Sequence, residues 1–404
     1  MPRYRTAAQL HLMEGTPPPP ERLVTLANWQ DPPFNRWGFQ HVRDLIPTAR
    51  IARGDGPVWK LPRAERDLND LAFTSGRRTL TVDRMLSETA TDGFMVLHRG
   101  KVVCEQYFNG MTPDTTHLLM SVSKSITSTI AGILIDRGQL SSSSFVSDVL
   151  PELRGTSFDG ATVQHLLDMR TGTRFSEDYV DLSAEVRVYE EIYLWRPATK
   201  RRLPSDATAY FATLKNDGEH GGPFRYRSVL TDVLGWVIER AGGARLAQLI
   251  STELWEPMGA EFDADVTVDG HGNAMADGGV CATLRDLARF GLVFAGGGTR
   301  GGRRIVPAAW IADVVSGAPD GVEAFAAGAD SADRRPGAHY RNKWWVLAPE
   351  VPAYAGLGIN GQMVFVHMPT KTVVVKFSTW KTALDPIADR WAVDGAFAIA
   401  NALG

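Results

Sequence analysis

The chain has 404 residues, of which 44% are hydrophobic and 22% charged, and its formal net charge is -3 at pH 7. This composition excludes wholesale disorder, and the length predicts one large domain or two closely packed domains. Nucleic-acid binding is disfavoured because the chain carries neither a net positive charge nor a long run of Lys or Arg.

The N-terminal residues lack the apolar core of a signal peptide, and no stretch of about 18 apolar residues predicts a membrane span. The two cysteines, Cys104 and Cys281, lie far apart in the sequence and form no Cys-x-x-Cys pair. Isolated thiols fit a reducing compartment better than a disulfide framework does. We therefore expect a cytoplasmic protein without a membrane partner.

The N-terminal third is expected to begin with an arm and to continue into strands. Residues 1–30 are expected to form an extended arm, because the run Pro17 to Pro20 favours a stiff, extended backbone. Residues 94–98 and 101–108 are strand-like runs on either side of a Gly-containing turn, which predicts an antiparallel hairpin. A helix is predicted to begin near Ser121, because apolar residues follow at helical spacing.

Helices are predicted to fill the middle of the chain, at 162–169, 206–214, 229–241, 245–255, 284–294 and 307–315. Strands return at 363–366 and 372–377, before a last helix at 387–403. This order predicts an α+β fold in which both chain ends build an antiparallel sheet flanked by helices, with a mostly helical region inserted. The expected division is an arm at 1–30, a sheet-containing region at 31–120 and 278–404, and a helical region at 121–277 that carries the nucleophile helix.

The candidate nucleophile is Ser121, with Lys124 three residues later. A helix places residues i and i+3 on one face, so the hydroxyl would lie beside the amine at a helix N-terminus. A lysine with a lowered pKa can take the serine proton. The pattern also arises by chance, so a capping serine followed by a surface lysine is the alternative.

Two later segments could complete such a site. Tyr226 precedes a predicted helix and could share a proton with Lys124, since phenol and amine both have reference pKa values of about 10. The glycine-rich residues 356–362 could bring a backbone N–H close to Ser121, because glycine permits close backbone approach. The alternatives are a packing aromatic and an ordinary turn.

These motifs resemble those of the serine β-lactamase and penicillin-recognising superfamily. Within it, the sequence is most similar to the 6-aminohexanoate-dimer hydrolases, which have a class C β-lactamase-like fold. The matching segments run through most of the chain, at 34–39, 117–125, 177–181, 231–234, 286–289, 344–345 and 358–362.

The resemblance implies a role for each matching residue. Ser121 would be the acylated nucleophile, with Lys124 and Tyr226 as general base and proton relay. The backbone N–H groups of Ser121 and Ile359 would form the oxyanion hole, and Tyr179 would close over an amide substrate and contact its scissile nitrogen. Substrate-side positions implied in the same way are the pocket-wall aromatics Trp195 and Trp345 and the recognition residues Glu190 and Asp277.

The sequence departs from the family at two places. Asn360 stands where the 6-aminohexanoate-dimer hydrolases have His and β-lactamases have Lys, which weakens recognition of a β-lactam carboxylate at this substrate-side position. Arg227 adds bulk and charge next to Tyr226. His117 is a further candidate on the substrate side, although a buried histidine is more often a hydrogen-bonded structural residue. Glu190 could equally be a surface carboxylate, and Trp345 a core residue.

The sequence lacks a Gly-x-Ser-x-Gly elbow, a His-Glu-x-x-His helix and nucleotide-binding glycine fingerprints, so no cofactor and no metal are implied. The expected function is hydrolysis of small linear amides or carboxyl esters through an acyl-Ser121 intermediate, with 6-aminohexanoate oligomers as one candidate substrate. The alternatives are a β-lactamase or D,D-peptidase, and a non-catalytic binding protein on the same scaffold. The sequence leaves open whether the protein forms a homodimer.

Overall fold

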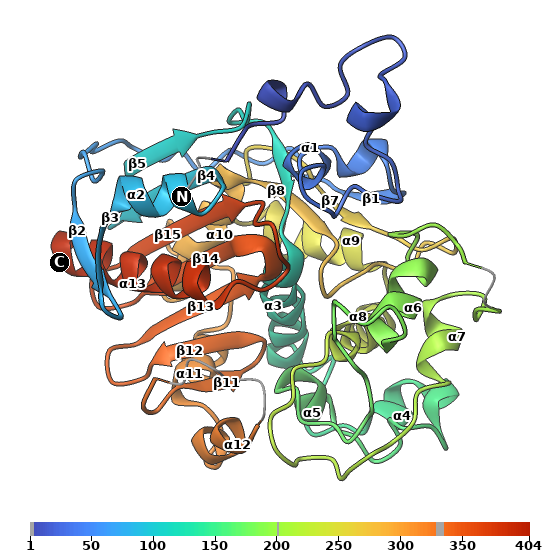
Figure 1. Ribbon diagram of the computed structural model, residues 1–404. Helices are drawn as coiled ribbons and strands as arrows, with labels where there is room; N and C mark the ends of the chain where they lie inside the picture. Colours follow the sequence, from blue (N-terminus) through green and yellow to red (C-terminus); the bar gives the residue numbers. More distant parts are fainter. Residues whose placement is uncertain (1–3, 200–201, 329–334) are drawn as a thin grey trace.

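A seven-stranded antiparallel sheet forms one side of the molecule and a group of helices forms the other, with helix α3 (Ser123–Asp136) between them (Figure 1). The computed structural model describes residues 4–199, 202–328 and 335–404. This arrangement confirms the expected α+β fold, with an antiparallel sheet, flanking helices and an inserted helical region.

The large sheet joins the two ends of the chain. Its strand order is β11-β12-β13-β14-β15-β4-β5, and every neighbouring pair is antiparallel. The central pairing aligns Val96 with Val374, which confirms that strands far apart in sequence lie side by side. The strands are β4 (Thr91–His98), β5 (Lys101–Tyr107), β11 (His339–Arg341), β12 (Trp344–Ala348), β13 (Ala353–Gly358), β14 (Gln362–His367) and β15 (Thr372–Ser378).

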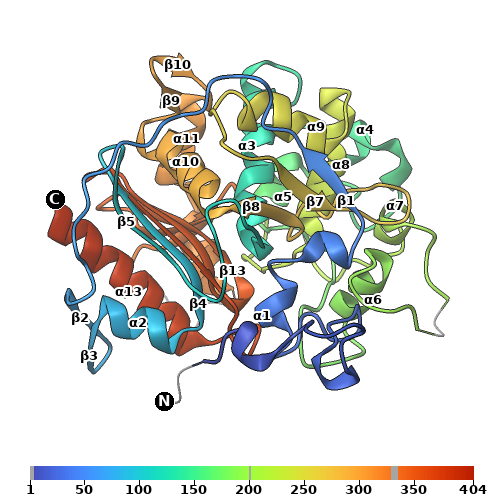
Figure 2. The same ribbon diagram turned by 90° about the horizontal axis from the view of Figure 1, so that it is seen from above.

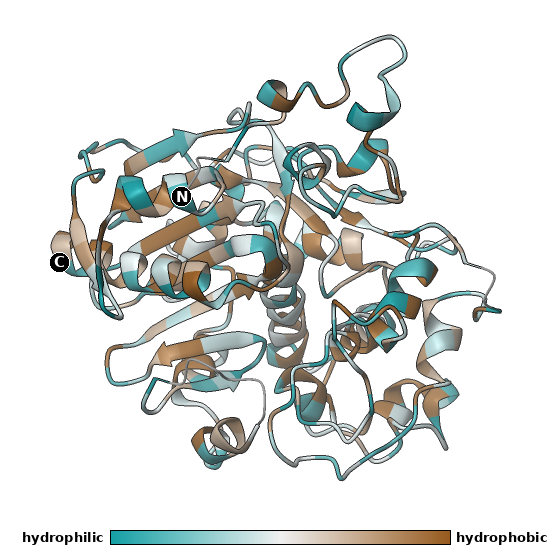
Figure 3. Ribbon diagram, viewed as in Figure 1, coloured by the Kyte–Doolittle hydropathy of each residue, from teal (hydrophilic) through white to brown (hydrophobic). Residues whose placement is uncertain are grey.

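Helices cover both faces of this sheet (Figure 2). α2 (Val82–Glu88) and α13 (Pro386–Leu403) pack on one face, and α10 (Leu284–Ala295) and α11 (Ala308–Ser316) lie on the other. Hydrophobic stretches run along the strands between these layers (Figure 3). Buried apolar area is the main favourable term in folding, so the sheet is a stable support for whatever lies at its edge.

A second sheet leads the chain into the nucleophile segment. Its order is β1-β7-β8-β6, with antiparallel pairs throughout. None of its strands was predicted from the sequence, because each has only three or four residues and period-2 alternation cannot be recognised over so short a run. The strands are β1 (Thr48–Ile51), β6 (Thr116–Leu118), β7 (Ala264–Thr267) and β8 (Val280–Thr283).

The helical region contains the predicted helices, most of them shortened, together with two that were not predicted, α4 and α6. The segment predicted as one helix at 245–255 is an α-helix followed by a π-helical turn at Ser251–Trp255. The helices are α4 (Val146–Val149), α5 (Val163–Leu167), α6 (Glu185–Ile192), α7 (Ala207–Phe211), α8 (Val229–Gly242) and α9 (Leu246–Ile250).

The remaining elements are short and lie at the periphery. They are α1 (Asn35–Gly38), α12 (Gly321–Ala327), and the two-stranded pairs β2 (Ala72–Ser75) with β3 (Arg78–Thr81) and β9 (Thr299–Arg300) with β10 (Arg303–Arg304).

The N-terminal segment differs from the extended arm expected over residues 1–30, of which 1–3 lie outside the described residues. It contains two short 3-10 helices, Ala8–Leu10 and Pro20–Arg22, and it buries Leu12, Val24 and Trp29. Trp29 has no exposed surface and donates from Nε1 to the carbonyl of Trp195 at 2.8 Å. Burial of this large side chain holds the segment against the helical region, an effect that proline content alone does not reveal.

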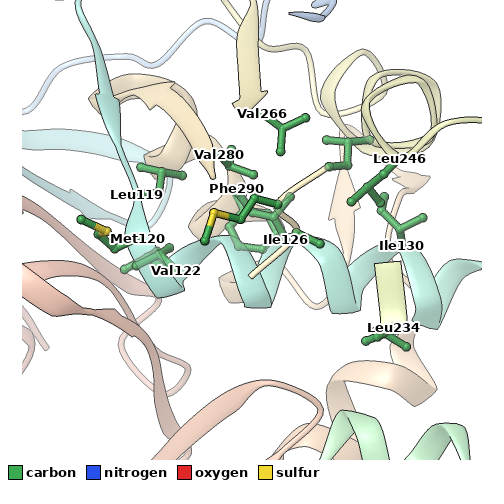
Figure 4. Close-up of a cluster of buried hydrophobic side chains, with 14 of the residues drawn as sticks. Leu119, Met120, Val122, Ile126, Ile130, Leu234, Leu246, Val266, Val280 and Phe290 are labelled. Atoms are coloured by element: carbon green, nitrogen blue, oxygen red, sulfur yellow. The ribbon is translucent and has the colours of Figure 1, made fainter. Parts of the chain in front are cut away.

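Helix α3 is anchored by apolar contacts on its buried side (Figure 4). Leu119 and Val122, just before the helix, and Ile126 and Ile130, within it, belong to the main hydrophobic core, and each is fully buried. A fully buried aliphatic side chain contributes about 1.5–3 kcal/mol, so this face fixes where the helix begins.

The structure also shows the state of the thiols and the nature of the helices. Cys104 and Cys281 are both buried and free. Among the described residues, no helix combines the length and the apolar character that crossing a bilayer requires.

Candidate active site

The nucleophile segment is a strand, a 3-10 turn and a helix in succession. β6 ends at Leu118, the 3-10 helix η4 spans Met120–Val122, and α3 begins at Ser123. Met120 adopts φ +47, a left-handed conformation that is rare outside glycine and that occurs at sites where the surrounding structure enforces it. Ser121 therefore lies at the helical entrance, where backbone N–H groups have no intrahelical acceptor.

Lys124 lies in the first turn of α3 and is completely buried. Its Nζ donates to Ser121 Oγ at 2.8 Å, to Ser228 Oγ at 2.9 Å and to the Asp277 carbonyl at 3.1 Å. The carboxylate of Asp277 is also close, with Oδ2 at 3.3 Å. The predicted contact between hydroxyl and amine is thus present in the structure.

The pKa of Lys124 is raised above its ordinary value. Burial lowers the pKa of this amine, but electrostatic interactions with Tyr226, Asp277 and Glu177 outweigh burial and raise it. A raised pKa favours the ammonium form, which must give up a proton before the amine can act as a base.

Tyr226 completes the polar centre. Lys124 Nζ lies 5.1 Å from the centre of its ring, and the ring stacks on Trp345 with centroids 5.6 Å apart. Burial raises the pKa of the phenol, an effect that the charge of Lys124 and hydrogen bonds to Ser121 and Lys124 oppose. Trp345, expected as a pocket wall, is half-buried and fixes the plane of Tyr226.

The end of β13 approaches the nucleophile closely. A Cβ atom on Gly358 would lie 3.0 Å from the backbone nitrogen of Ser121 and 2.8 Å from the Leu119 carbonyl. Only glycine fits at this position without displacing backbone. Ile359 directly follows this close contact, and its part in an oxyanion hole with Ser121 stays a prediction.

Asp277, expected to recognise substrate, instead contacts the lysine directly. Its backbone N–H donates to Asp232 Oδ1 at 3.2 Å. Burial and the charge of Asp277 raise the pKa of Asp232 well above its usual range.

The loop before α6 brings Tyr179 to the site. The Tyr179 hydroxyl donates to Glu177 Oε2 at 3.4 Å, and the Tyr179 carbonyl accepts from Arg187. Glu177 Oε1 accepts the backbone N–H of Ser228. Sequence reasoning assigned no role to Glu177, which lies in the matching segment 177–181, or to Ser228, which follows Tyr226 by two residues.

Glu190 is not available to bind a substrate ammonium group. Its carboxylate is buried and forms ion pairs with Arg187, at 2.8 Å, and with Arg196. Two guanidinium groups already compensate its charge, so its role is to fasten α6 and the loop that carries Tyr179.

Three other expected substrate-side residues are buried away from solvent. Trp195 donates from Nε1 to Thr267 Oγ1 at 3.0 Å and packs in the core. His117 has no exposed surface and contacts Asp92 at 3.2 Å, which matches the structural alternative. Asn360 adopts φ +59 and donates its side-chain amide to the Trp380 carbonyl at 3.1 Å.

Arg227 does not extend over the nucleophile. Its guanidinium is buried, donates to the Thr171 carbonyl at 2.8 Å and lies 3.4 Å from Asp217. Among the described residues, no group of three or more His, Cys, Asp or Glu side chains could hold a metal ion.

The site holds a Ser-x-x-Lys pair, with its lysine buried, beside a tyrosine at the junction of an antiparallel sheet and a helical region. This arrangement defines a serine hydrolase of the β-lactamase-like class. The chain belongs to the Beta-lactamase family, whose family model matches residues 82–397. It is an enzyme, and hydrolysis of amides or esters is the chemistry that its relatives share.

The relatives include both amide and ester hydrolases. The chain is 38% identical over 373 residues to 6-aminohexanoate-dimer hydrolase from Paenarthrobacter ureafaciens, covering 91% of this chain and 90% of that protein. It is 30% identical over 154 residues, 37% of this chain, to esterase EstB from Burkholderia gladioli. A solved Bacillus anthracis structure, provisionally described as a 6-aminohexanoate-dimer hydrolase, aligns with a TM-score of 0.86 at 26% identity, over 96% of this chain and 98% of that one.

Proposed function

We propose that this enzyme cleaves small linear amides and carboxyl esters through an acyl-Ser121 intermediate, with linear 6-aminohexanoate oligomers among the amides. The observation that carries the proposal is the hydrogen bond from Lys124 to Ser121, 2.8 Å long, in a centre that also contains Tyr226. The extent of identity to the Paenarthrobacter ureafaciens hydrolase supports an amide substrate.

Lys124 first loses one proton to solvent, with Tyr226 as the relay, because its raised pKa favours the ammonium form. As Ser121 Oγ then attacks the carbonyl carbon, the Ser121 proton passes to the neutral amine of Lys124. The developing oxyanion would accept from the N–H groups of Ser121 and Ile359. The leaving amine takes a proton as the C–N bond breaks, and water then hydrolyses the acyl-enzyme.

A β-lactamase or D,D-peptidase is the second candidate, favoured by the family model that the chain matches. Recognition of a β-lactam carboxylate would benefit from a cation at position 360, whereas Asn360 is neutral and donates to the Trp380 and Thr382 carbonyls. Turnover of nitrocefin comparable to that of an ester would favour this candidate.

The test of the proposal is release of free amine from the linear 6-aminohexanoate dimer, run beside hydrolysis of p-nitrophenyl butyrate, with the wild type and Ser121→Ala. Both activities should disappear in the variant. Ester cleavage without amine release would make the protein a carboxylesterase. If neither activity depended on Ser121, a non-catalytic binding protein on this scaffold would be the remaining interpretation.

A further inference from the structure

We propose that Glu177 orients the hydroxyl of Tyr179 and supplies the proton that this hydroxyl passes to the leaving amine, so that amide cleavage depends on Glu177 far more than ester cleavage does. This inference rests on the proposed function, because it concerns the amide reaction of the same site. It adds to the site a carboxyl group that neither the motif pattern nor the comparisons assign.

The carboxylate of Glu177 lies between two parts of the site. Its Oε1 accepts the backbone N–H of Ser228, and its Oε2 accepts the Tyr179 hydroxyl at 3.4 Å. Ser228 in turn accepts a hydrogen bond from Lys124. Glu177 therefore connects the loop that carries Tyr179 to the nucleophile's lysine.

Several charged and titratable groups surround the carboxyl group of Glu177. They are Lys124 from α3, Tyr340 from β11, Tyr226 and Asp277 from neighbouring segments, and Tyr179 from its own loop. Burial raises the pKa of Glu177, the charge of Lys124 opposes that shift, and Asp277 adds to it. A carboxyl group with a raised pKa retains a protonated fraction nearer to neutral pH, as a proton donor must.

The leaving groups of an amide and an ester differ in their need for a proton. An amide nitrogen needs a proton as its bond to carbon breaks, whereas the p-nitrophenolate of an ester leaves without one. When the C–N bond breaks, its electron pair stays on nitrogen, which takes the Tyr179 proton, and Tyr179 oxygen takes the proton of the Glu177 acid. During deacylation, water adds its hydroxyl to the acyl carbon and its proton returns to Glu177, while Ser121 recovers its own.

The variant that tests this is Glu177→Gln. The carbonyl oxygen of Gln can still accept from Ser228, but its amide N–H is too weakly acidic to transfer a proton to Tyr179. Amide cleavage should fall about a hundredfold in kcat/KM, in the range typical of a lost general acid, and ester cleavage by less than about fivefold. The matched control is Asp178→Asn, an exposed change in the same loop that keeps an acceptor for the Val180 N–H. It should alter kcat/KM for neither the amide nor the ester.

A double-mutant cycle separates a proton path from a structural contact. If Tyr179 acts through Glu177, the double variant Glu177→Gln with Tyr179→Phe should lose no more amide activity than Tyr179→Phe alone. Additive losses, or equal losses on amide and ester, would overturn the inference while Ser121-dependent hydrolysis stands.

A measurement on the wild type covers the case in which the variant does not fold. Its amide kcat/KM should decline at high pH as Glu177 loses its proton, whereas its ester kcat/KM should not decline in that range. Parallel profiles for amide and ester would contradict the role of Glu177. Ester cleavage without any amide cleavage would overturn both this inference and the amide part of the proposed function.

Discussion

At the scale of single residues, the site is a balance of charges around one buried ammonium. Lys124 is surrounded by Asp277 and by the hydroxyls of Ser121 and Ser228, so the amine is held at a short distance from the nucleophile but in its charged form. Orientation and basicity are thus controlled by different neighbours. The nucleophile is positioned by hydrogen bonds, and its base is activated only when a proton leaves.

This balance predicts the pH dependence of the reaction. Because the pKa of Lys124 is raised, its neutral fraction grows about tenfold for each pH unit below that pKa, and kcat/KM for ester cleavage should rise with pH. Asp277→Asn removes one of the charges that raise the pKa of Lys124. The acid limb of the profile of kcat/KM against pH should therefore move to lower pH. The control is Glu253→Gln, which alters a surface pair with Arg137. A limb that stays in place in Asp277→Asn would contradict this account.

The close approach of Gly358 to Ser121 gives a second prediction at this scale. Gly358→Ala puts a methyl group 3.0 Å from the Ser121 nitrogen and 2.8 Å from the Leu119 carbonyl, so backbone must shift by a few tenths of an ångström. Loss of an oxyanion donor typically costs about 10²–10³ in kcat, and we expect a loss of that order. The measurement is kcat together with the midpoint of thermal unfolding, and Gly218→Ala, where the added methyl meets open space, is the control.

At the scale of elements, sequence patterns predicted the long elements and missed the short ones. The hairpin β4–β5, helix α3 and the last helix α13 have clear periods, and the structure confirms all three. The strands of the second sheet are too short to show a period. They form because β8 contributes buried apolar residues between β7 and β6, a tertiary effect that local propensity does not contain.

The same limit applied to the site. Ser121, Lys124 and Tyr226 could be identified because their spacing is a motif, and the structure brings them together. Burial and pairing could not be read from the sequence. Glu190 and Asn360 therefore looked like substrate-side groups, although the charge of one and the donors of the other are already used within the protein.

The packing of α3 against α11 predicts the cost of disturbing the nucleophile helix. A Cβ atom on Gly132 would overlap the ring of Trp310, so Gly132→Ala forces two helices apart. Overpacking of this kind costs about 1–3 kcal/mol, and the loss should be measurable by urea unfolding. Gly270→Ala, which meets no neighbour, is the control. If unfolding of Gly132→Ala matched that of the control, Trp310 would have to be able to move aside.

At the scale of the whole molecule, a buried polar network joins segments that are distant in sequence. Arg36 follows the N-terminal segment, Asp92 lies on β4, His117 on β6, and Thr379 directly after β15. Asp92 Oδ1 lies 2.7 Å from Arg36, and Asp92 Oδ2 contacts His117 at 3.2 Å and accepts from Thr379 at 2.9 Å. One carboxylate therefore ties both sheets to the N-terminal part of the chain, close to the strand that leads to the nucleophile.

Removing that charge should destabilise the fold as a unit. Asp92→Asn leaves the guanidinium of Arg36 buried without a counterion, and a broken buried pair typically costs about 3–5 kcal/mol. Glu152→Gln removes an exposed partner of Arg240 and should cost less than about 1 kcal/mol. Chemical unfolding of both variants measures the difference. Because the same carboxylate contacts β4, β6 and the segment after β15, one cooperative transition at lower denaturant concentration is expected for Asp92→Asn. Two separate transitions would show instead that the network holds only one of the sheets.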